Sequence, residues 1–336
     1  MHNLVDWDSL HANHFRGVRV LVTGGAGFIG SHLSEVLASL GAAVVVLDDL
    51  SGGSVDNLAS FGPVEFVRGS ILDRDILEKC TNACRYVFHL AALGSVPRSV
   101  EEPRLYHEVN STGTLNVLEA ARTAGVRRVM FAASSSCYGE NPVPWVETMP
   151  VLPRSPYAAT KVAGEALLSA YAANYGMDTA SLRYFNIFGP RQNANSAYAA
   201  VIAAFAAALL AGRNPVIFGD GEQSRDFTFV YNAVHANLLA ARHTGTIGGQ
   251  ALNVGCGTSI SVNELARVMA ESLGRTDLHP EHRPQRAGDL KHSFADLGLS
   301  RGVLKYQPIV DFKTGLEKTV QWYRSEYASG TGARVG

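Results

Sequence analysis

Short apolar runs alternate with longer helical patterns through the first half of the chain. The apolar runs predict buried strands at residues 18–23, 44–47, 64–67, 86–90, 128–132 and 179–183. Helical spacing of apolar residues separates most of them, notably at residues 27–40, 113–124 and 157–175. Regular alternation of strand and helix predicts an α/β fold with a doubly wound, Rossmann-like parallel sheet, in which ligands bind at the carboxyl ends of the strands.

A glycine-rich turn joins the first predicted strand to the first predicted helix. Gly24, Gly27 and Gly30 have the spacing G-x-x-G-x-x-G, which permits a tight turn and lets a pyrophosphate approach the backbone at the helix N-terminus. Asp48 closes the second strand, close to the position at which an acid holds the adenosine ribose. An aspartate repels a 2′-phosphate, and residues 47–61 contain no lysine or arginine to offset it. The pattern therefore favours NAD over NADP.

The pattern changes after about residue 185. Short segments with turn residues follow, such as residues 216–221, and then helical patterns at residues 262–273 and 311–327. We expect four parts: an N-terminal extension (1–17), an NAD-binding Rossmann domain (18–185), a smaller mixed α/β C-terminal substrate-binding domain (186–328) with segments interleaved with the first, and a flexible tail (329–336).

Tyr157 and Lys161 lie four residues apart in a predicted helix, downstream of the nucleotide motif. Positions i and i+4 share a helix face, so the phenol and the ammonium are expected to point into one site. A nearby positive charge lowers the pKa of a tyrosine, which can then take a proton from a hydroxyl while a nicotinamide accepts hydride from the same carbon. The serines at 134–136 follow a predicted strand and could hydrogen-bond the reacting oxygen. The group indicates an enzyme that oxidises an alcohol carbon, transiently or for good.

Composition and charge disfavour several other classes of function. The 336 residues are 46% hydrophobic and carry a formal net charge of −1 without a basic tract, which argues against nucleic acid or an acidic membrane as a partner. Cys80, Cys84, Cys137 and Cys256 indicate reduced thiols and a cytoplasmic location instead of a disulfide framework. The eleven histidines show no zinc-like spacing, so no metal site is predicted.

No segment is typical of a secretion signal or a membrane span. Residues 1–16 carry Asp6, Asp8 and several histidines and lack an apolar core. The longest apolar stretch, residues 197–211, is rich in alanine and too short to span a bilayer comfortably, which favours a buried helix.

On these motifs the chain resembles the extended short-chain dehydrogenase/reductases, in their NAD-dependent nucleotide-sugar epimerase/dehydratase branch. The similarity covers about residues 18–323. It implies that Ser134, Tyr157 and Lys161 form the catalytic set, with Ser136 as a secondary contact to a sugar, and that NAD is bound tightly and recycled. The implied contacts with NAD are Gly24, Gly27, Phe28, Ile29, Asp48, Asp49, Ser51, Gly52, Ser70, Ile71, Leu90, Ala91, Ala92, Tyr157, Lys161 and Phe185.

The two residues after Ser134 favour an epimerase within this branch. Sugar dehydratases carry an Asp-Glu pair there, and uronate decarboxylases tend to carry a glutamate at the second position. Ser135 and Ser136 stand there instead, and hydroxyls cannot do strong acid–base work near neutral pH. We expect redox-neutral epimerisation at C4 through a transient 4-keto sugar. A dehydratase is the alternative within the branch, and a non-catalytic NAD-binding regulatory protein is the alternative from another class.

Further matches imply a UDP-sugar as the substrate. Residues 183–186 resemble the segment in which a phenylalanine touches nicotinamide and an asparagine holds a phosphate. Residues 219–227 resemble the loop whose arginine grips the diphosphate or uridine, and residues 286–289 resemble a segment with a second arginine and a ribose-binding aspartate. The implied substrate contacts are Gly94, Ser95, Ser134, Ser136, Asn186, Ala200, Val201, Phe218, Arg225, Arg286, Asp289 and Ser293.

Finer similarity points to the UDP-N-acetylglucosamine 4-epimerases of the family. Residues 91–99 and 197–202 resemble theirs. Epimerases restricted to non-acetylated sugars often carry a bulky tyrosine where this chain has Ser293, so the serine implies room for the acetamido group of UDP-GlcNAc or UDP-GalNAc. UDP-glucose and UDP-GlcNAc uronate are the alternative substrates.

One segment departs from the family pattern. Members usually have Gly-Asp-Ile after the third strand, with the aspartate on adenine, whereas this chain has Ser70 between Gly69 and Ile71. A neutral hydroxyl can still hydrogen-bond there. The resemblance also implies a homodimer, formed through the helices at residues 113–124 and 157–175.

Overall fold

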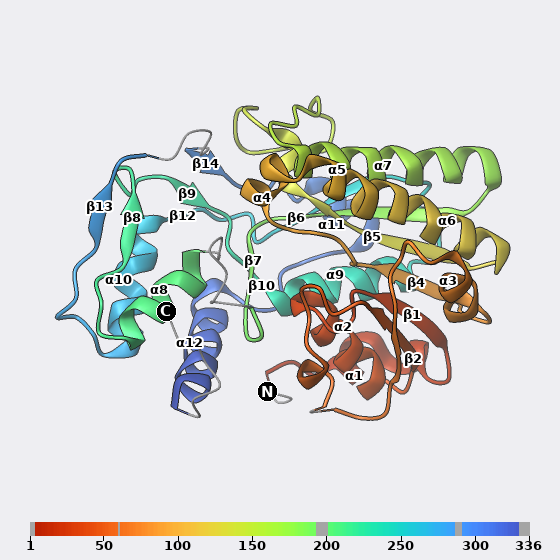
Figure 1. The fold of residues 1–336 in the computed structure, drawn as a ribbon, viewed down its shortest axis with the longest axis horizontal. Helices are drawn as coiled ribbons and strands as arrows, with labels where there is room; N and C mark the ends of the chain where they lie inside the picture. Colours follow the sequence, from red (N-terminus) through yellow and green to blue (C-terminus); the bar gives the residue numbers. More distant parts are fainter. Residues whose placement is uncertain (1–3, 60, 193–200, 286–290, 329–336) are drawn as a thin grey trace.

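A seven-stranded parallel sheet forms the centre of the computed structural model, which describes residues 4–59, 61–192, 201–285 and 291–328 (Figure 1). The strands, in their order across the sheet, are β3 (Glu65–Arg68), β2 (Ala43–Asp48), β1 (Arg19–Thr23), β4 (Tyr86–His89), β5 (Arg128–Ser134), β6 (Asp178–Tyr184) and β11 (Ala251–Val254). The predicted doubly wound sheet is confirmed. Its order reverses between β1 and β4, and in such sheets the ligand binds at the carboxyl ends of the strands at this switch point.

Helices cover both faces of the sheet, which explains why its strands are continuous apolar runs (Figure 1). Successive residues of β1 point to opposite faces: Val20 packs with the core under α2 and α9, and Leu21 packs with the core under α3, α6 and α7. The helices are α2 (Phe28–Ser39), α9 (Val230–Arg242), α3 (Arg74–Thr81), α6 (Gly113–Thr123) and α7 (Pro156–Tyr175), and a shorter helix, α11 (Gly298–Leu304), packs beside β11.

The second half of the chain contributes to the central sheet and also forms a smaller α/β region. β11 pairs with β6 and α9 packs on the sheet, so the sheet continues past residue 185. In the smaller region, α8 (Val201–Leu210), α10 (Val262–Leu273) and α12 (Phe312–Ala328) pack on one another. α8 falls within the predicted buried helix, whose residues 197–200 lie outside the described part of the chain. The predicted domain boundaries stay predictions, and the predicted tail at 329–336 also lies outside the described residues.

The short strands of this region bring distant segments together. They form three small sheets. The first consists of β12 (Ile260–Ser261), β9 (Ser224–Arg225) and β14 (His292–Ser293), the second of β8 (Val216–Phe218) and β13 (Glu281–Arg283), and the third of β7 (Ile187–Phe188) and β10 (Thr228–Phe229). In the first of these, Ser293 and Arg225 are direct register partners. Two residues predicted to contact substrate from far apart in the sequence are therefore neighbours.

The N-terminal extension is part of the folded core from residue 4 onward. It forms α1 (Trp7–His11) and a 3₁₀ turn, η1 (Ala12–Phe15). The Trp7 ring packs edge-on against Tyr231, and His11 Nε2 lies 3.1 Å from Nδ1 of His235. Both partners belong to α9. Burial lowers the pKa of His11 to about 3, so this contact joins neutral rings near neutral pH.

Several smaller observations bear on the sequence predictions. All four cysteines are free thiols, as predicted. None of the described helices has the length and apolarity needed to cross a membrane. In the same described residues, no three histidine, cysteine or acidic side chains gather as a metal site would require.

Candidate active site

The turn between β1 and α2 is packed so closely that its glycines have no room for a side chain. A Cβ added at Gly30 would lie 2.1 Å from the carbonyl oxygen of Gly24. Gly24 itself has φ of +70°, and a Cβ there would lie 2.7 Å from the nitrogen of Ala91. Gly27 is the N-cap of α2, which no side chain caps. The first amides of α2 are thus available to a pyrophosphate that approaches over side-chain-free backbone.

Asp48, at the end of β2, hydrogen-bonds both the glycine turn and the segment that follows β2. Its Oδ2 accepts a hydrogen bond of 2.9 Å from the Ala26 nitrogen, and its Oδ1 accepts one of 2.8 Å from the Leu50 nitrogen. Burial raises the pKa of Asp48, and these backbone hydrogen bonds oppose the rise. The carboxylate lies where an adenosine ribose would bind beside the turn, so the residues present fit a dinucleotide without a 2′-phosphate.

A cavity of about 890 Å³ runs from this turn across the carboxyl ends of the central strands. The predicted NAD contacts that line it are Gly24, Gly27, Phe28, Ile29, Asp48, Asp49, Ser51, Gly52, Ile71, Leu90, Ala91, Ala92, Tyr157 and Lys161. The predicted substrate contacts that line it are Gly94, Ser134, Ser136, Asn186, Arg225 and Ser293. One cavity therefore joins the nucleotide turn, the catalytic group and the smaller α/β region.

Ser134 and Tyr157 meet at the wall of this cavity. Ser134 ends β5, and Tyr157 lies in the first turn of α7, whose N-cap Ser155 accepts a hydrogen bond from the Ala158 nitrogen. The Ser136 hydroxyl, in the 3₁₀ turn η4 (Ser135–Tyr138), donates to Ser134 Oγ at 2.9 Å. Ser134 is also hydrogen-bonded to the Tyr157 side chain. This hydrogen bond with Ser134 favours the charged form of Tyr157 and so opposes the rise of its pKa.

Lys161 is buried one helical turn beyond Tyr157. Its Nζ donates a hydrogen bond of 2.8 Å to the carbonyl oxygen of Ala132 and lies 4.9 Å from the centre of the Phe131 ring. The Tyr157 ring centre is 5.8 Å away. Burial lowers the pKa of Lys161 to about 8, and the Glu165 carboxylate opposes the shift.

The expected lowering of the tyrosine pKa by Lys161 is wrong for the polypeptide by itself. Burial raises the pKa of Tyr157, the hydrogen bond with Ser134 opposes the rise, and Tyr106 adds to it. The predicted shared helix face is present, and the Lys161 ammonium is bound to the Ala132 carbonyl, but burial outweighs the opposing contributions to the Tyr157 pKa. Proton removal at neutral pH therefore requires additional positive charge near Tyr157.

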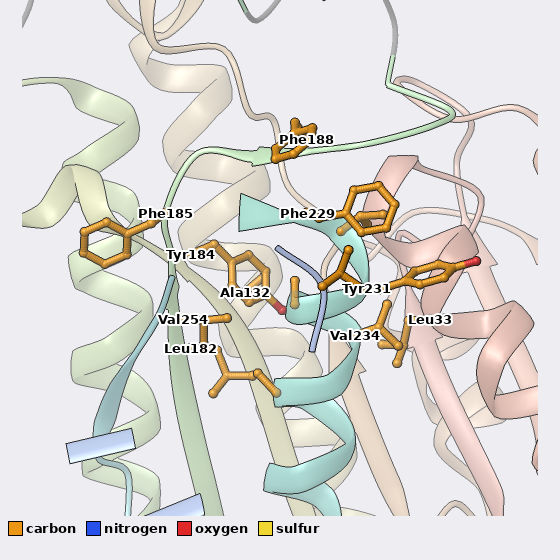
Figure 2. Close-up of a cluster of buried hydrophobic side chains, with 14 of the residues drawn as sticks. Leu33, Ala132, Leu182, Tyr184, Phe185, Phe188, Phe229, Tyr231, Val234 and Val254 are labelled. Carbon is orange, nitrogen blue, oxygen red and sulfur yellow. The ribbon is translucent and has the colours of Figure 1, made fainter. Parts of the chain in front are cut away.

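Phe185 and Ser70 do not line the cavity, contrary to expectation. The Phe185 ring is fully buried, with its centre 6.2 Å from that of Tyr138 and 5.8 Å from that of Trp145. Figure 2 shows it turned to the opposite side of the chain from Tyr184, as strand alternation requires. Ser70 Oγ accepts a hydrogen bond from the Leu72 nitrogen, because a side chain this short closes its own turn before it can reach outward.

Three predicted substrate contacts are also absent from the cavity wall. Ser95 caps α4 (Val96–Glu101), where its Oγ accepts a hydrogen bond from the Arg98 nitrogen. Val201 begins α8, and Phe218 ends β8, where its carbonyl oxygen accepts a hydrogen bond from Gln223. Ala200, Arg286 and Asp289 lie outside the described residues, so their roles stay predictions.

The sequence argument missed a number of cavity-lining residues, among them the polar or aromatic Glu140, Trp145, Arg154 and Gln192. Arg154 and Glu140 form an ion pair of 3.2 Å at an exposed part of the wall. Glu140, Trp145 and Arg154 have one signal in the sequence, their position, since the loop between β5 and α7 must cross the carboxyl edge of the sheet. Gln192 follows β7 and has no such signal. No motif marks the loop, because a loop that follows a strand end can take many side chains without loss of the fold.

The fold and the site define a class: a Rossmann-type dinucleotide-binding enzyme whose cavity is lined by a serine, a tyrosine and a lysine beyond the glycine turn. The model of the NAD dependent epimerase/dehydratase family matches residues 20–255. The chain belongs to this family, is an enzyme and uses NAD.

Relatives of known name cover almost the whole chain. A UDP-glucose 4-epimerase of Mycolicibacterium smegmatis is 45% identical over 92% of this chain and 99% of its own. The structure of a UDP-N-acetylglucosamine 4-epimerase of Methanobrevibacter ruminantium, in complex with UDP-N-acetylmuramic acid, is 41% identical, with a TM-score of 0.88 over 93% of this chain and 99% of its own. A dTDP-glucose 4,6-dehydratase of Streptomyces venezuelae with NAD bound is 32% identical, with a TM-score of 0.85 over 93% and 98%.

Proposed function

We propose that the chain epimerises a UDP-hexose at C4, with UDP-GlcNAc and UDP-GalNAc as its substrates. The observation that carries the proposal is the composition of the catalytic wall. Ser134 and Tyr157 are hydrogen-bonded at one end of the cavity, and serines occupy the two positions at which dehydratases of the family carry acids. The wall can therefore move the proton of a hydroxyl and has no strong acid at the strand end with which to eliminate water.

Among the described residues, Glu140 is the acid near this wall, and it is poorly suited to elimination. Glu140 lines the cavity but is 65% exposed and paired with Arg154. The other described carboxylates of the cavity, Asp48 and Asp49, lie at the adenosine end. A dehydratase would need an acid beside the sugar, so the described residues support epimerisation over dehydration.

The protein's own groups act on the 4-hydroxyl. Tyr157 removes the hydroxyl proton, and Ser134, held by Ser136, orients the oxygen. NAD held by the glycine turn and Asp48 would supply a reversible hydride acceptor for C4 and a positive ring charge that favours the phenolate. The Lys161 ammonium, 5.8 Å from the centre of the Tyr157 ring, adds a second positive charge. Tyr157 returns the proton at the end, and the hydride returns to C4, so the reaction consumes no net proton and causes no net oxidation.

The sugar end of the cavity has room for a 4-keto sugar to turn over. Small residues line it: Gly94, Ser135, Ser136 and Gly139. Return of hydride to the other face of C4 requires the sugar ring to rotate while the UDP part stays anchored. Arg225, which lines the same cavity, supports the anchoring role because guanidinium groups bind diphosphates well. NAD that is reoxidised in each cycle need not leave, which supports tight retention.

The identity of the sugar depends on Ser293. Its side chain forms part of the cavity wall, and its Oγ lies 3.3 Å from Asn186 Nδ2, which donates to it. A serine here leaves space beside the sugar for an acetamido group. The Methanobrevibacter neighbour supports an N-acetylated substrate, whereas the name of the Mycolicibacterium relative keeps UDP-glucose as the alternative.

We also propose a homodimer that packs through α6 and α7, as the family resemblance implies. Leu115 on α6 and Tyr175 at the end of α7 are exposed apolar side chains on these helices. Such exposed apolar groups are common at interfaces between subunits.

An NMR product assay tests the proposed reaction. Purified protein is incubated with UDP-GlcNAc, UDP-Glc and UDP-GlcNAc uronate in turn, without added NAD. We expect UDP-GlcNAc to yield an equilibrium mixture with its C4 epimer, because retained NAD is recycled. A 4-keto-6-deoxy product would instead identify a dehydratase. No turnover of any substrate, with NAD retained, would favour a regulatory protein.

A further inference from the structure

A third titratable residue shares the face of α7 that carries Tyr157 and Lys161. Glu165 lies one helical turn beyond Lys161, so the three positions follow i, i+4 and i+8. The Glu165 side chain is only 11% exposed. The reaction described above uses the tyrosine and the lysine but gives this buried carboxylate no role.

Arg183, on the neighbouring strand β6, fixes the Glu165 carboxylate. Arg183 Nε donates to Oε1 at 2.9 Å, and Nη2 donates to Oε2 at 2.7 Å. The guanidinium also lies 4.7 Å from the centre of the Tyr138 ring. Although burial opposes a charge on Arg183, its hydrogen bonds to Glu165 raise its pKa. A bidentate pair of this kind holds the carboxylate in one orientation, one helical turn along α7 from Lys161.

The other groups around Lys161 provide no negative charge. In the described part of the chain, the titratable side chains that act on Lys161 and Tyr157 from the packed elements are Glu165 on α7, His89 on β4 and Tyr106 on α5 (Pro103–Tyr106). Arg183 on β6 reaches this group through its hydrogen bonds to Glu165. Burial lowers the pKa of His89 to about 3, so it is neutral near pH 7. Burial raises the pKa of Tyr106, which is neutral as well. Among the described residues, Glu165 is therefore the anion that opposes the desolvation of Lys161.

We propose that Glu165 is a positioning residue of the active site: its carboxylate, fixed by Arg183, keeps the buried Lys161 ammonium charged. A charged Lys161 favours the phenolate of Tyr157 and thus removal of the 4-hydroxyl proton. The link to catalysis rests on the proposed epimerase function. The effect of Glu165 on the charge state of Lys161 does not depend on that function. The charge state and the epimerase function can therefore be tested separately.

A direct titration of Lys161 tests the proposal without an activity assay. The chain has six lysines, and in the part of the chain that the structure describes Lys161 is the one that is buried. Protein labelled with ¹³C at lysine Cε is titrated by NMR in the presence of saturating NAD⁺, and the Lys161 resonance is assigned with Lys161→Met. We expect Glu165→Gln to lower the midpoint of Lys161 by about one to two pH units, the scale of one charge at helix-neighbour distance in a protein.

Arg183→Gln is the reciprocal variant. It removes the cation that compensates Glu165 and leaves the carboxylate beside the lysine. We expect the midpoint of Lys161 to move upward, opposite to the shift in Glu165→Gln. Loss of stability cannot explain shifts of opposite sign from the two halves of one ion pair.

Asp178→Asn is the matched control. Asp178 pairs with Arg128 at the amino ends of β5 and β6, with side-chain exposures of 15% and 1%. The variant breaks a buried pair of the same kind at the far edge of the sheet. We expect it to lower thermal stability and to leave the Lys161 midpoint unchanged.

Two results would overturn the proposal: a Lys161 midpoint equal to that of wild type in both Glu165→Gln and Arg183→Gln, or shifts of the same sign. If Glu165→Gln does not fold, Arg183→Gln decides alone, since the proposal requires an upward shift there. The alkaline limb of the pH–rate profile is expected to move with the NMR midpoints. A wild-type enzyme that epimerises no UDP-sugar would refute the proposed function while the titration still tests the role of Glu165.

Discussion

Replacing Tyr157 with phenylalanine is expected to lower kcat for C4 epimerisation by about two orders of magnitude or more, the scale of general acid–base catalysis. Phenylalanine keeps the ring in place and removes the one group at this wall that can take the 4-hydroxyl proton. Ser134 cannot replace it, because an unactivated hydroxyl is a very weak base near neutral pH. The measurement is the initial rate of epimer formation at saturating UDP-GlcNAc.

Two controls separate chemistry from folding. Tyr171→Phe removes a phenol from the same helix, at a position where the hydroxyl donates to Glu119 outside the cavity, and is expected to leave kcat near that of wild type. The NAD content of Tyr157→Phe is expected to match that of wild type, because the glycine turn and Asp48 are untouched. Near-normal turnover in Tyr157→Phe would remove the phenol from its assigned role.

Replacing Ser293 with tyrosine is expected to abolish turnover of UDP-GlcNAc before that of UDP-Glc. Ser293 is 5% exposed and part of the cavity wall, beside Asn186. A phenol at this position would extend into the space assigned to the acetamido group, whereas a C2 hydroxyl needs less room. We expect the ratio of kcat/KM for UDP-GlcNAc over UDP-Glc to fall by roughly 100-fold, the upper scale at which pocket size discriminates between substrates.

Ser293→Ala distinguishes space from hydrogen bonding. It removes the hydroxyl that accepts from Asn186 and keeps the room beside the sugar. Turnover of UDP-GlcNAc within a few fold of wild type is the expected result for alanine. If the tyrosine variant shows unchanged UDP-GlcNAc kinetics, or if alanine is as damaging as tyrosine, pocket width at this residue does not set the choice of sugar.

Six of the seven strands of the central sheet could be predicted from the sequence, because most of them are buried on both faces, whereas β11 was missed. The predicted strand at 18–23 became Arg19–Thr23, and the predicted helix at 262–273 has the same bounds as α10. Continuous apolar runs and glycine stops carry this information locally. The two-residue ladders of the smaller region could not be predicted, because two residues are too few to show a period. The register that places Ser293 beside Arg225 likewise depends on tertiary packing and cannot be read from the local sequence.

The residues of the catalytic group could be predicted from the sequence, but the directions of their pKa shifts could not. Spacing on one helix placed Tyr157 near Lys161, and the structure agrees. The direction of the Tyr157 pKa shift depends on burial, which outweighs the hydrogen bond with Ser134, and burial at this position cannot be read from spacing. Phe185 was assigned to the cavity by resemblance, whereas its packing against Tyr138 and Trp145 turns it into the core.

The fate of the hydrogen at C4 of the sugar tests the account most directly. UDP-GlcNAc with deuterium at C4 is incubated with the enzyme in ordinary water, and the C4 epimer is examined by NMR and mass spectrometry. The account predicts that the deuterium remains at C4 of the product, since it leaves as hydride, stays with the retained cofactor and returns to the same carbon. Loss of the deuterium to water, or its appearance at another carbon, would contradict transient oxidation at C4.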